Sequence, residues 1–270
     1  MVSKNQIKLI RQLDQKKYRR REGLFVAEGP KVVGDLLRAG FRPTAVFATE
    51  EWGRADAAFP SVRSSVSEPV AVDKYLSEPV TLVSDDELRK LSFLQHPQQI
   101  LALFPIPEPL TQGFDVNGLC IALDGIQDPG NLGTIIRIAD WFGISTIYCS
   151  EGTADAWNPK VVQATMGSIA RVNIIYTDLA RLIDSIQVPV YGTLLDGENI
   201  YTQPLSSEGL IVMGNEGNGI SPDIRQRITH RLLIPDFHDG ETAESLNVAI
   251  ATAITCSEFR RRSMCFHKIT

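Results

Sequence analysis

The sequence is poor in cysteine and lacks both metal-binding spacings and long apolar runs. Its four cysteines, Cys120, Cys149, Cys256 and Cys265, show no CxxC pattern, so we expect reduced core thiols and neither a metal site nor disulfides. No run of about 18 apolar residues is present, which argues against a membrane span. Residues 1–21 have no apolar core of the signal-peptide kind, and we expect a cytoplasmic protein.

The composition is that of a soluble globular protein with room for two domains. The 270 residues are 43% hydrophobic and 22% charged, and the net charge of −5 argues weakly against a nucleic-acid partner. Between residues 4 and 21, however, eight basic residues stand against a single acid, Asp14. Two interpretations of this segment remain open, a solvated helix face or a surface that binds nucleic-acid phosphates.

A linker divides the chain at residues 105–116. The surrounding stretch, "FPIPEPLTQGFDVNG", has three prolines, two glycines and no usable periodicity. Before it, residues 1–104 predict a small α/β domain with helices over 3–17 and 29–40 and strands over 44–49 and 98–104. Ser84 and Glu87 form a capping box that starts a further helix, whereas residues 54–70 show no regular pattern.

After the linker, residues 117–270 predict a parallel sheet with helices on both faces, because continuous apolar runs alternate with helical segments. The predicted strands are "LCIALD", "STIYCS", "VNIIYT", "VPVYGTLL", "GLIVMG" and "RLLIP". The helices are predicted to begin near Asn131, Pro159, Asp178, Ser221 and Ser245. Ligands of such sheets bind beyond the carboxyl ends of the strands, and three loops there carry polar residues.

The first loop, "LDGIQDPGNLGTIIRIADWFGI", ends a strand and opens a helix. Asn131 is placed either to cap this helix or to contact a ligand. Arg137 lies two turns inside, among apolar residues, where a cation needs a carboxylate or phosphate partner. The loop is therefore a candidate for an anion-binding site.

The second loop, "IVMGNEGNGIS", holds three glycines within six positions. Glycines let a backbone approach a ligand closely or take positive φ angles. Neither the P-loop pattern nor the dinucleotide pattern G-x-G-x-x-G is met, so no phosphate cradle is indicated. Glu216 is either a solvated turn carboxylate or a residue of the site.

The third loop leads into "ESLNVAIATAI", a helix that is apolar almost all round and therefore predicted to be buried. Ser245 is its natural N-cap. Asn247 falls inside the first turn, where its amide must face a loop or a ligand. Arg260, Arg261 and Arg262 at the far end suit the helix dipole.

In their order and spacing, the three loops resemble the motifs of the SpoU (TrmH-type) family of RNA ribose methyltransferases, within the SPOUT class. The matching segments are "DPGNLGTIIRIADWFG", "IVMGNEGNGIS" and "LLIPDFHDGETAESLNVAIATAI", and "NPKVVQATMGSIARV" resembles the segment usual between the first two. The resemblance covers about residues 117–262, and residues 18–104 look more loosely like the small RNA-binding domain that often precedes them. The chain departs from the family pattern in its loop 236–242, which is about three residues longer.

The resemblance implies a C-terminal trefoil knot, S-adenosylmethionine as cofactor, and methyl transfer to a ribose 2′-hydroxyl of rRNA or tRNA. It places the cofactor against Gly214, Asn215, Gly219, Ile234 and Leu246. The catalytic positions would be Asn131, Arg137, Glu216, Ser245 and Asn247. Arg137 would bind an RNA phosphate, and Glu216 would act as a base or orient the arginine.

Further implications concern partners. The family is typically homodimeric, with one subunit's arginine completing the other's site, and no metal is implied. The basic segment then acquires a role in RNA binding, through Lys16, Lys17, Arg19, Arg20 and Arg21.

Three alternatives remain. A knotted methyltransferase that acts on an RNA base nitrogen would share the same pocket. A catalytically inactive RNA-binding homologue would need neither Arg137 nor Glu216. An oxidoreductase with a nucleotide cofactor is disfavoured because G-x-G-x-x-G does not follow the first long strand.

Overall fold

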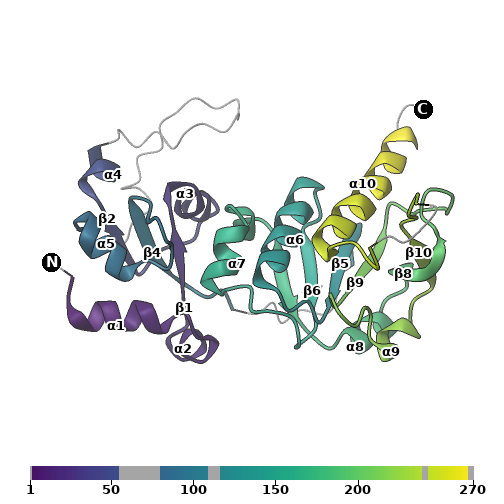
Figure 1. The fold of residues 1–270 in the computed structure, drawn as a ribbon, viewed down its shortest axis with the longest axis horizontal. Coiled ribbons are helices and arrows are strands. Elements are labelled where there is room, and N and C mark those ends of the chain that lie inside the picture. Colours follow the sequence, from purple (N-terminus) through teal and green to yellow (C-terminus); the bar gives the residue numbers. More distant parts are fainter. Residues whose placement is uncertain (1, 55–79, 109–115, 239–242, 267–270) are drawn as a thin grey trace. The chain divides into compact units, whose positions relative to one another are not determined.

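The computed structural model describes residues 2–54, 80–108, 116–238 and 243–266. The chain forms two compact units, one of Met1–Glu108 with Asp155–Ala170 and one of Pro109–Ala154 with Arg171–Thr270 (Figure 1). Each unit has its own sheet. The predicted mixed α/β class with a parallel sheet is confirmed.

The first unit contains a four-stranded sheet in the order β1-β4-β2-β3. Its strands are β1 (Leu24–Glu28), β2 (Ala45–Ala48), β3 (Thr81–Leu82) and β4 (Ile100–Pro105). Its helices include α1 (Lys4–Gln12), α2 (Lys16–Glu22), α3 (Pro30–Arg38), α4 (Glu50–Arg54) and α5 (Asp85–Leu91). One face of the sheet is closed by apolar side chains of α1 and α5, among them Ile10, Leu13 and Leu91.

The N-terminal helix predicted over residues 3–17 is wrong, because two helices occupy this region. A capping box at Ser3 starts α1, and buried Leu13 ends it. Gln15 then begins α2, which ends at Gly23 in the left-handed conformation. The Ser84–Glu87 capping box is confirmed, and most of the irregular segment 54–70 lies outside the described residues.

Residues 155–170, which the sequence places in the second domain, pack within the first unit instead. This segment holds α7 (Pro159–Ala164) and the short 3-10 helix η2 (Ser168–Ala170). The ring of Trp157 lies 4.6 Å from that of Phe25 on β1, centroid to centroid. A buried ion pair joins Arg19 of α2 to Asp155. These contacts correct the predicted division of the chain.

The second unit contains six strands, all parallel, in the order β10-β8-β9-β5-β6-β7. All six predicted strands are present, as β5 (Leu119–Asp124), β6 (Thr146–Cys149), β7 (Asn173–Tyr176), β8 (Val190–Asn199), β9 (Gly209–Gly214) and β10 (His230–Leu233). The helices described here are α6 (Pro129–Trp141), α8 (Leu179–Ser185), α9 (Pro222–Arg225) and α10 (Val248–Phe266).

Helices cover both faces of this sheet. Alternate side chains of β5 and β9, such as Ala122 and Val212, pack with Leu182 of α8 and Ile224 of α9. On the other side α6 lies along α10, which also contacts β9 (Figure 1). The carboxyl ends of the central strands therefore form one edge, from which the loops into α6, α9 and α10 project.

Three cysteines, Cys120, Cys149 and Cys256, are buried free thiols. Burial raises the pKa of the Cys149 thiol, and it raises that of Cys256 to about 12. Both thiols therefore stay protonated near neutral pH. In the described part of the chain, no helix is long and apolar enough to cross a bilayer.

Candidate active site

Three loops of the second unit are joined by one chain of hydrogen bonds. The carboxylate of Glu216 accepts from the Asn131 amide at 2.9 Å and, at longer range, from the backbone N–H groups of Gln127 (3.3 Å) and Asp128 (3.4 Å). The side-chain oxygen of Asn131 in turn accepts from the Asn247 amide at 2.9 Å. Polar residues about 85 and 116 positions apart thus meet beside one another.

Asn247 caps α10, and the prediction that Ser245 does so is wrong. The Asn247 side-chain oxygen accepts from the N–H of Ala249 at 2.9 Å and of Ile250 at 3.3 Å. Its NH2 group stays available for Asn131, so one amide ends the helix and holds the first loop. Ser245 is exposed and lies before the helix begins.

Asn131 does not cap α6. Asp128 is the N-cap, and its carboxylate accepts from the backbone N–H of Asn131 at 2.8 Å. Pro129 follows at the first helical position, where its missing N–H costs nothing. The side chain of Asn131 is therefore left to connect Glu216 with Asn247. The Asp–Pro pair was the signal for the helix start that the sequence interpretation overlooked.

Glu216 remains an anion at neutral pH. Burial alone would raise its pKa, but the hydrogen bonds from Asn131 and from backbone N–H groups outweigh burial and lower the pKa below its usual range. The carboxylate also lies at the N-terminus of α6, where the helix dipole favours negative charge. A carboxylate held in this way is a weak base and an effective anchor.

A cavity of about 750 Å³ lies beside the second and third loops, and neither Asn131 nor Asn247 lines it. All five residues predicted for the cofactor, Gly214, Asn215, Gly219, Ile234 and Leu246, line it, as do Glu216 and Ser245. The walls come from β8, the loop after β9, the end of β10, the segment before α10 and the first turn of that helix.

The loop after β9 presents its backbone to this cavity. A side chain at Gly214 would overlap the backbone of Gly219 and Ile220, and Gly219 itself has a φ of 68°. Asn215 fixes the turn, accepting from the N–H groups of Gly217 at 2.9 Å and Asn218 at 3.0 Å. The cavity therefore has a wall of backbone donors and acceptors beside the apolar side chains of Ile234 and Leu246.

Arg137 is not brought to this cavity by its own chain. It is exposed on α6, does not line the cavity and makes no described hydrogen bond to Glu216. The anionic partner predicted for it is absent from the described residues. The periodicity of α6 explains this position, because Arg137 shares the outer face of the helix with Thr134 and Trp141.

The helix α10 is less buried than predicted. Ile250 is 52% exposed, and Trp141 on the neighbouring α6 is 85% exposed. Each of the two helices thus presents a large apolar side chain to solvent, and Trp141 shares its helix face with Arg137. This exposure has a bearing on the oligomeric state.

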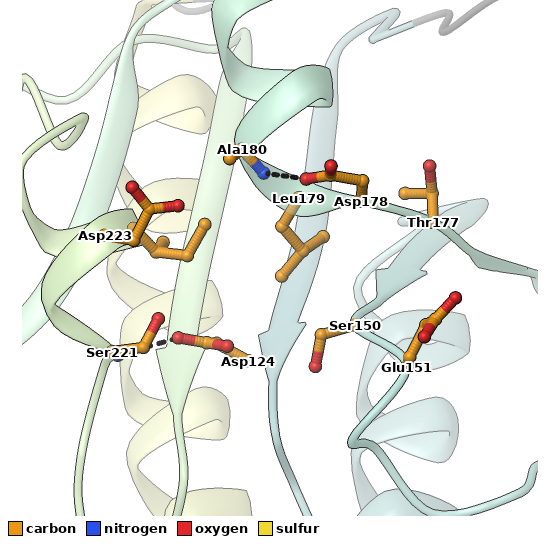
Figure 2. A pocket seen from close by; sticks show the side chains of 10 residues that line it. Asp124, Ser150, Glu151, Thr177, Asp178, Leu179, Ala180, Ser221 and Asp223 are labelled. Atoms are coloured by element: carbon orange, nitrogen blue, oxygen red, sulfur yellow. Dashed lines mark hydrogen bonds between the residues drawn. The ribbon is translucent and has the colours of Figure 1, made fainter.

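A second cavity, of about 400 Å³, lies at the carboxyl ends of β5, β6 and β7 (Figure 2). Four carboxylates contribute to its lining, those of Asp124, Glu151, Asp178 and Asp223. Asp124 accepts from the N–H of Ser221 at 2.7 Å, and Asp178 caps α8. No predicted site residue lies here. No cation lines the cavity either, so it does not suit a phosphate.

The predicted RNA-binding segment divides into two sets. Lys16, Lys17, Arg20 and Arg21 are exposed on α2. Arg19 is only 1% exposed, and including it among RNA contacts is wrong. Its guanidinium donates to Asp155, at 2.9 Å from Nε, and to the carbonyls of Leu13 and Asp14 at 2.7 Å. Arg19 therefore ties α2 to residues 155–170 within the first unit.

Metal ligation finds no support in the geometry. Over the described ranges, no group of three or more His, Cys, Asp or Glu side chains could hold a metal ion.

The parallel sheet and the hydrogen-bonded loops are arranged as expected for the class that the sequence resembles, that of S-adenosylmethionine-dependent RNA methyltransferases. Residues 118–257 match the SpoU rRNA Methylase family, and residues 4–102 match the MRM3-like substrate binding domain. The chain belongs to the SpoU rRNA methylase family, and the predicted resemblance is confirmed.

The relatives match over almost the whole chain. The 23S rRNA (guanosine(2553)-2'-O)-methyltransferase RlmP of Bacillus subtilis is 30% identical over 96% of this chain and 97% of its own length. A putative RNA methyltransferase of the TrmH family from Porphyromonas gingivalis is 41% identical, with a TM-score of 0.81 over 97% of this chain and 99% of its own. An AdoMet-bound rRNA methyltransferase from Sinorhizobium meliloti is 30% identical, with a TM-score of 0.81 over 97% of each chain.

Proposed function

We propose that this chain transfers a methyl group from S-adenosylmethionine to a ribose 2′-hydroxyl of ribosomal RNA. The observation that carries the proposal is the bonded chain Glu216–Asn131–Asn247 beside the cavity of about 750 Å³. It joins the three loops in which the reacting groups would meet. Ribosomal RNA is favoured over tRNA because a relative of nearly equal length acts on 23S rRNA. A cytoplasmic location is part of the proposal, as the sequence predicts.

Cofactor binding is assigned to Gly214, Asn215, Gly219, Ile234 and Leu246. The glycines and Asn215 offer backbone groups at close range, and Ile234 and Leu246 offer apolar contact. When bound, S-adenosylmethionine supplies an activated methyl group on a sulfonium, which is a good leaving group. The protein must then orient the ribose hydroxyl and help it lose a proton.

Glu216, Asn131 and Asn247 are assigned to holding this geometry. Because its pKa is lowered and its oxygens accept hydrogen bonds, Glu216 suits the anchoring of the loops better than the removal of a proton. Ser245 lines the cavity and is exposed, so its hydroxyl is placed to bind the substrate.

Arg137 is assigned to the active site of a second copy of the chain. A homodimer that pairs the exposed faces of α6 and α10 would cover Trp141 and Ile250. It would also carry each Arg137 toward the other subunit's cavity. There the guanidinium would bind an RNA phosphate and lower the pKa of the ribose hydroxyl. A guanidinium does not readily act as a base itself.

RNA binding outside the site is assigned to Lys16, Lys17, Arg20 and Arg21 on α2. Their charges suit the phosphate backbone, and the Lys17 ammonium and Arg21 guanidinium each lie 4.8 Å from the ring centre of Tyr18. The first unit as a whole is proposed to be the substrate-binding domain.

A trefoil knot is proposed for the second unit. Its support is that β8, the loop after β9 and the segment before α10 all wall the same cavity. The parallel strands β8 and β10 also approach each other closely, since a side chain at Gly197 would overlap the backbone of Leu232, and their register shifts between Arg231 and Leu232.

The function is tested by methylating ribosomal RNA from cells that lack the protein, using purified protein and labelled S-adenosylmethionine. We expect label in a ribose, seen as one phosphodiester bond that becomes resistant to alkali. Label in a base would favour the alternative of base-nitrogen methylation. Binding of RNA and cofactor without any transfer would favour the inactive homologue, provided the same preparation retains its fold.

A further inference from the structure

The cavity of about 750 Å³ is lined by several acids and a single cation among the described residues. The cation is Arg225 on α9, and the acids are Asp196, Glu216 and Glu244. None of the three sequence motifs includes Arg225, which is the last residue of a four-residue helix beyond the glycine loop. Its presence in the cofactor cavity therefore requires its own explanation.

Arg225 is held in place from one side only. Its Nη2 atom donates to the carboxylate of Asp196 on β8, which also lines the cavity. Nε and Nη1 of Arg225 form no hydrogen bond with the described residues, so the guanidinium keeps donors for another acceptor.

The charge at this end of the cavity is not balanced. The Asp196 oxygen that accepts from Arg225 also lies 3.6 Å from Nη1 of Arg231. Two guanidinium groups thus share one carboxylate, which leaves a positive excess. Arg227, two positions later in the sequence, differs, since it pairs with both Asp184 and Asp223 and does not line the cavity. The excess is complementary to an anionic group of a bound molecule.

S-adenosylmethionine carries two cationic groups, the sulfonium and the ammonium, and one anionic group, the α-carboxylate. The acids of the cavity suit the two cations, and Arg225 is the one cationic side chain among its described lining residues that suits the carboxylate. We propose that Arg225, positioned by Asp196, binds the α-carboxylate of the methionyl part through a charge-assisted hydrogen bond. This inference rests on the proposed cofactor, and it adds a residue that fixes the direction of the methionyl chain in the cavity.

The test removes the carboxylate from the ligand and the guanidinium from the protein in turn. Calorimetry measures the Kd of S-adenosylhomocysteine and of S-adenosyl-3-thiopropylamine, which lacks only the carboxylate, with wild type and with Arg225→Met. We expect wild type to bind S-adenosylhomocysteine about five- to twentyfold more tightly than the amine. Arg225→Met is expected to bind the two ligands with nearly equal Kd values. Arg227→Met is the matched control and should keep the wild-type preference.

The possible results distinguish a failure of the inference about Arg225 from a failure of the proposed function. If wild type binds neither ligand, the proposed function fails. If wild type binds both ligands equally, Arg225 does not recognise the carboxylate, and this result needs no variant to fold. If Arg225→Met weakens both ligands by the same factor, its role is structural. If it leaves both Kd values unchanged and weakens RNA binding, the guanidinium serves an RNA phosphate. Each of the last three results overturns the inference.

Discussion

At the scale of single residues, Asn247 shows why an amide opens α10. Its oxygen accepts from backbone N–H groups of the first helical turn, while its NH2 group donates to Asn131. A carboxylate could perform the first task and not the second, because an ionised carboxylate has no donor. The stability of the helix and the geometry of the site can therefore be separated by substitution at this one position.

Asn247→Asp is expected to keep the stability of the protein and to lower methyl transfer by about tenfold or more, since the bond to Asn131 is lost and a second anion is placed near Glu216. Asn247→Ala is expected to lose about 1 kcal/mol of unfolding free energy as well. Urea unfolding and initial rates measure the two effects. If Asn247→Asp keeps full activity, the hydrogen bond to Asn131 has no part in the reaction.

The same residues show how far sequence reasoning reaches at this scale. Asn131, Glu216, Ser245 and Asn247 were identified as polar residues of the site, and they do lie on loops that converge. Their partners were not predictable. Near the start of each helix, two polar residues can serve as the N-cap. They are Asp128 or Asn131 for α6, and Ser245 or Asn247 for α10. Which of the two residues caps the helix depends on hydrogen bonds to a loop about 85 or more positions away.

At the scale of elements, arginines near the end of α10 hydrogen-bond to neighbouring segments of the chain. The sequence predicts only that they complement the helix dipole. Arg260 donates to the carbonyls of Phe142 and Gly143 at the end of α6. Arg262 binds Glu258 and the carbonyls of Ile200, Tyr201 and Gln203 after β8. These bonds tie the helix to the strand that walls the cofactor cavity.

The ion pairs of Glu258 with Arg261 and Arg262, which we call the clamp, make a pH-dependent contribution to the free energy of unfolding. Hydrogen bonds from Arg261 lower the pKa of Glu258 from its ordinary value of 4.5 to about 2. A carboxyl whose folded pKa is depressed stabilises the protein above its unfolded pKa, and that stability is lost as the pH falls through the folded value. We expect the stability difference between wild type and Glu258→Gln to be constant from pH 7 to about 5 and to shrink toward pH 2. Urea titrations at each pH measure it, and a constant difference down to pH 2 would contradict the clamp.

Elements were predicted best where the apolar pattern was continuous. All six strands of the parallel sheet were predicted because their apolar runs are continuous. The central strands β5 and β9 are buried almost throughout, whereas the edge strands β7 and β10 are only partly buried. The strand β1 was missed, since its five residues follow the basic segment directly. The break between α1 and α2 was also missed. At this break the carbonyls of Leu13 and Asp14 accept from Arg19, which also pairs with Asp155, and no local pattern in residues 3–17 reveals these contacts.

At the scale of the whole molecule, one chain supplies the cavity and the bonded loops but not the predicted arginine. Arg137 lies on an exposed face of α6 with Trp141, which is 85% exposed, and the neighbouring α10 carries Ile250, which is 52% exposed. Large apolar side chains gathered on one face are typical of a surface that another protein covers. A symmetric pair of chains meets both needs, burying the apolar face and completing each site.

The most direct measurement is complementation between two inactive variants. Arg137→Ala lacks the arginine, and Leu246→Arg fills the cofactor cavity from an exposed position. Each variant alone is expected to be inactive. In a heterodimer, the Arg137→Ala subunit has an intact cavity and receives Arg137 from its partner. Equal mixing after subunit exchange is therefore expected to restore about a quarter of wild-type methyl transfer, because half of the dimers are mixed and each has one intact site. A mixture that stays inactive although heterodimers form would contradict the shared site.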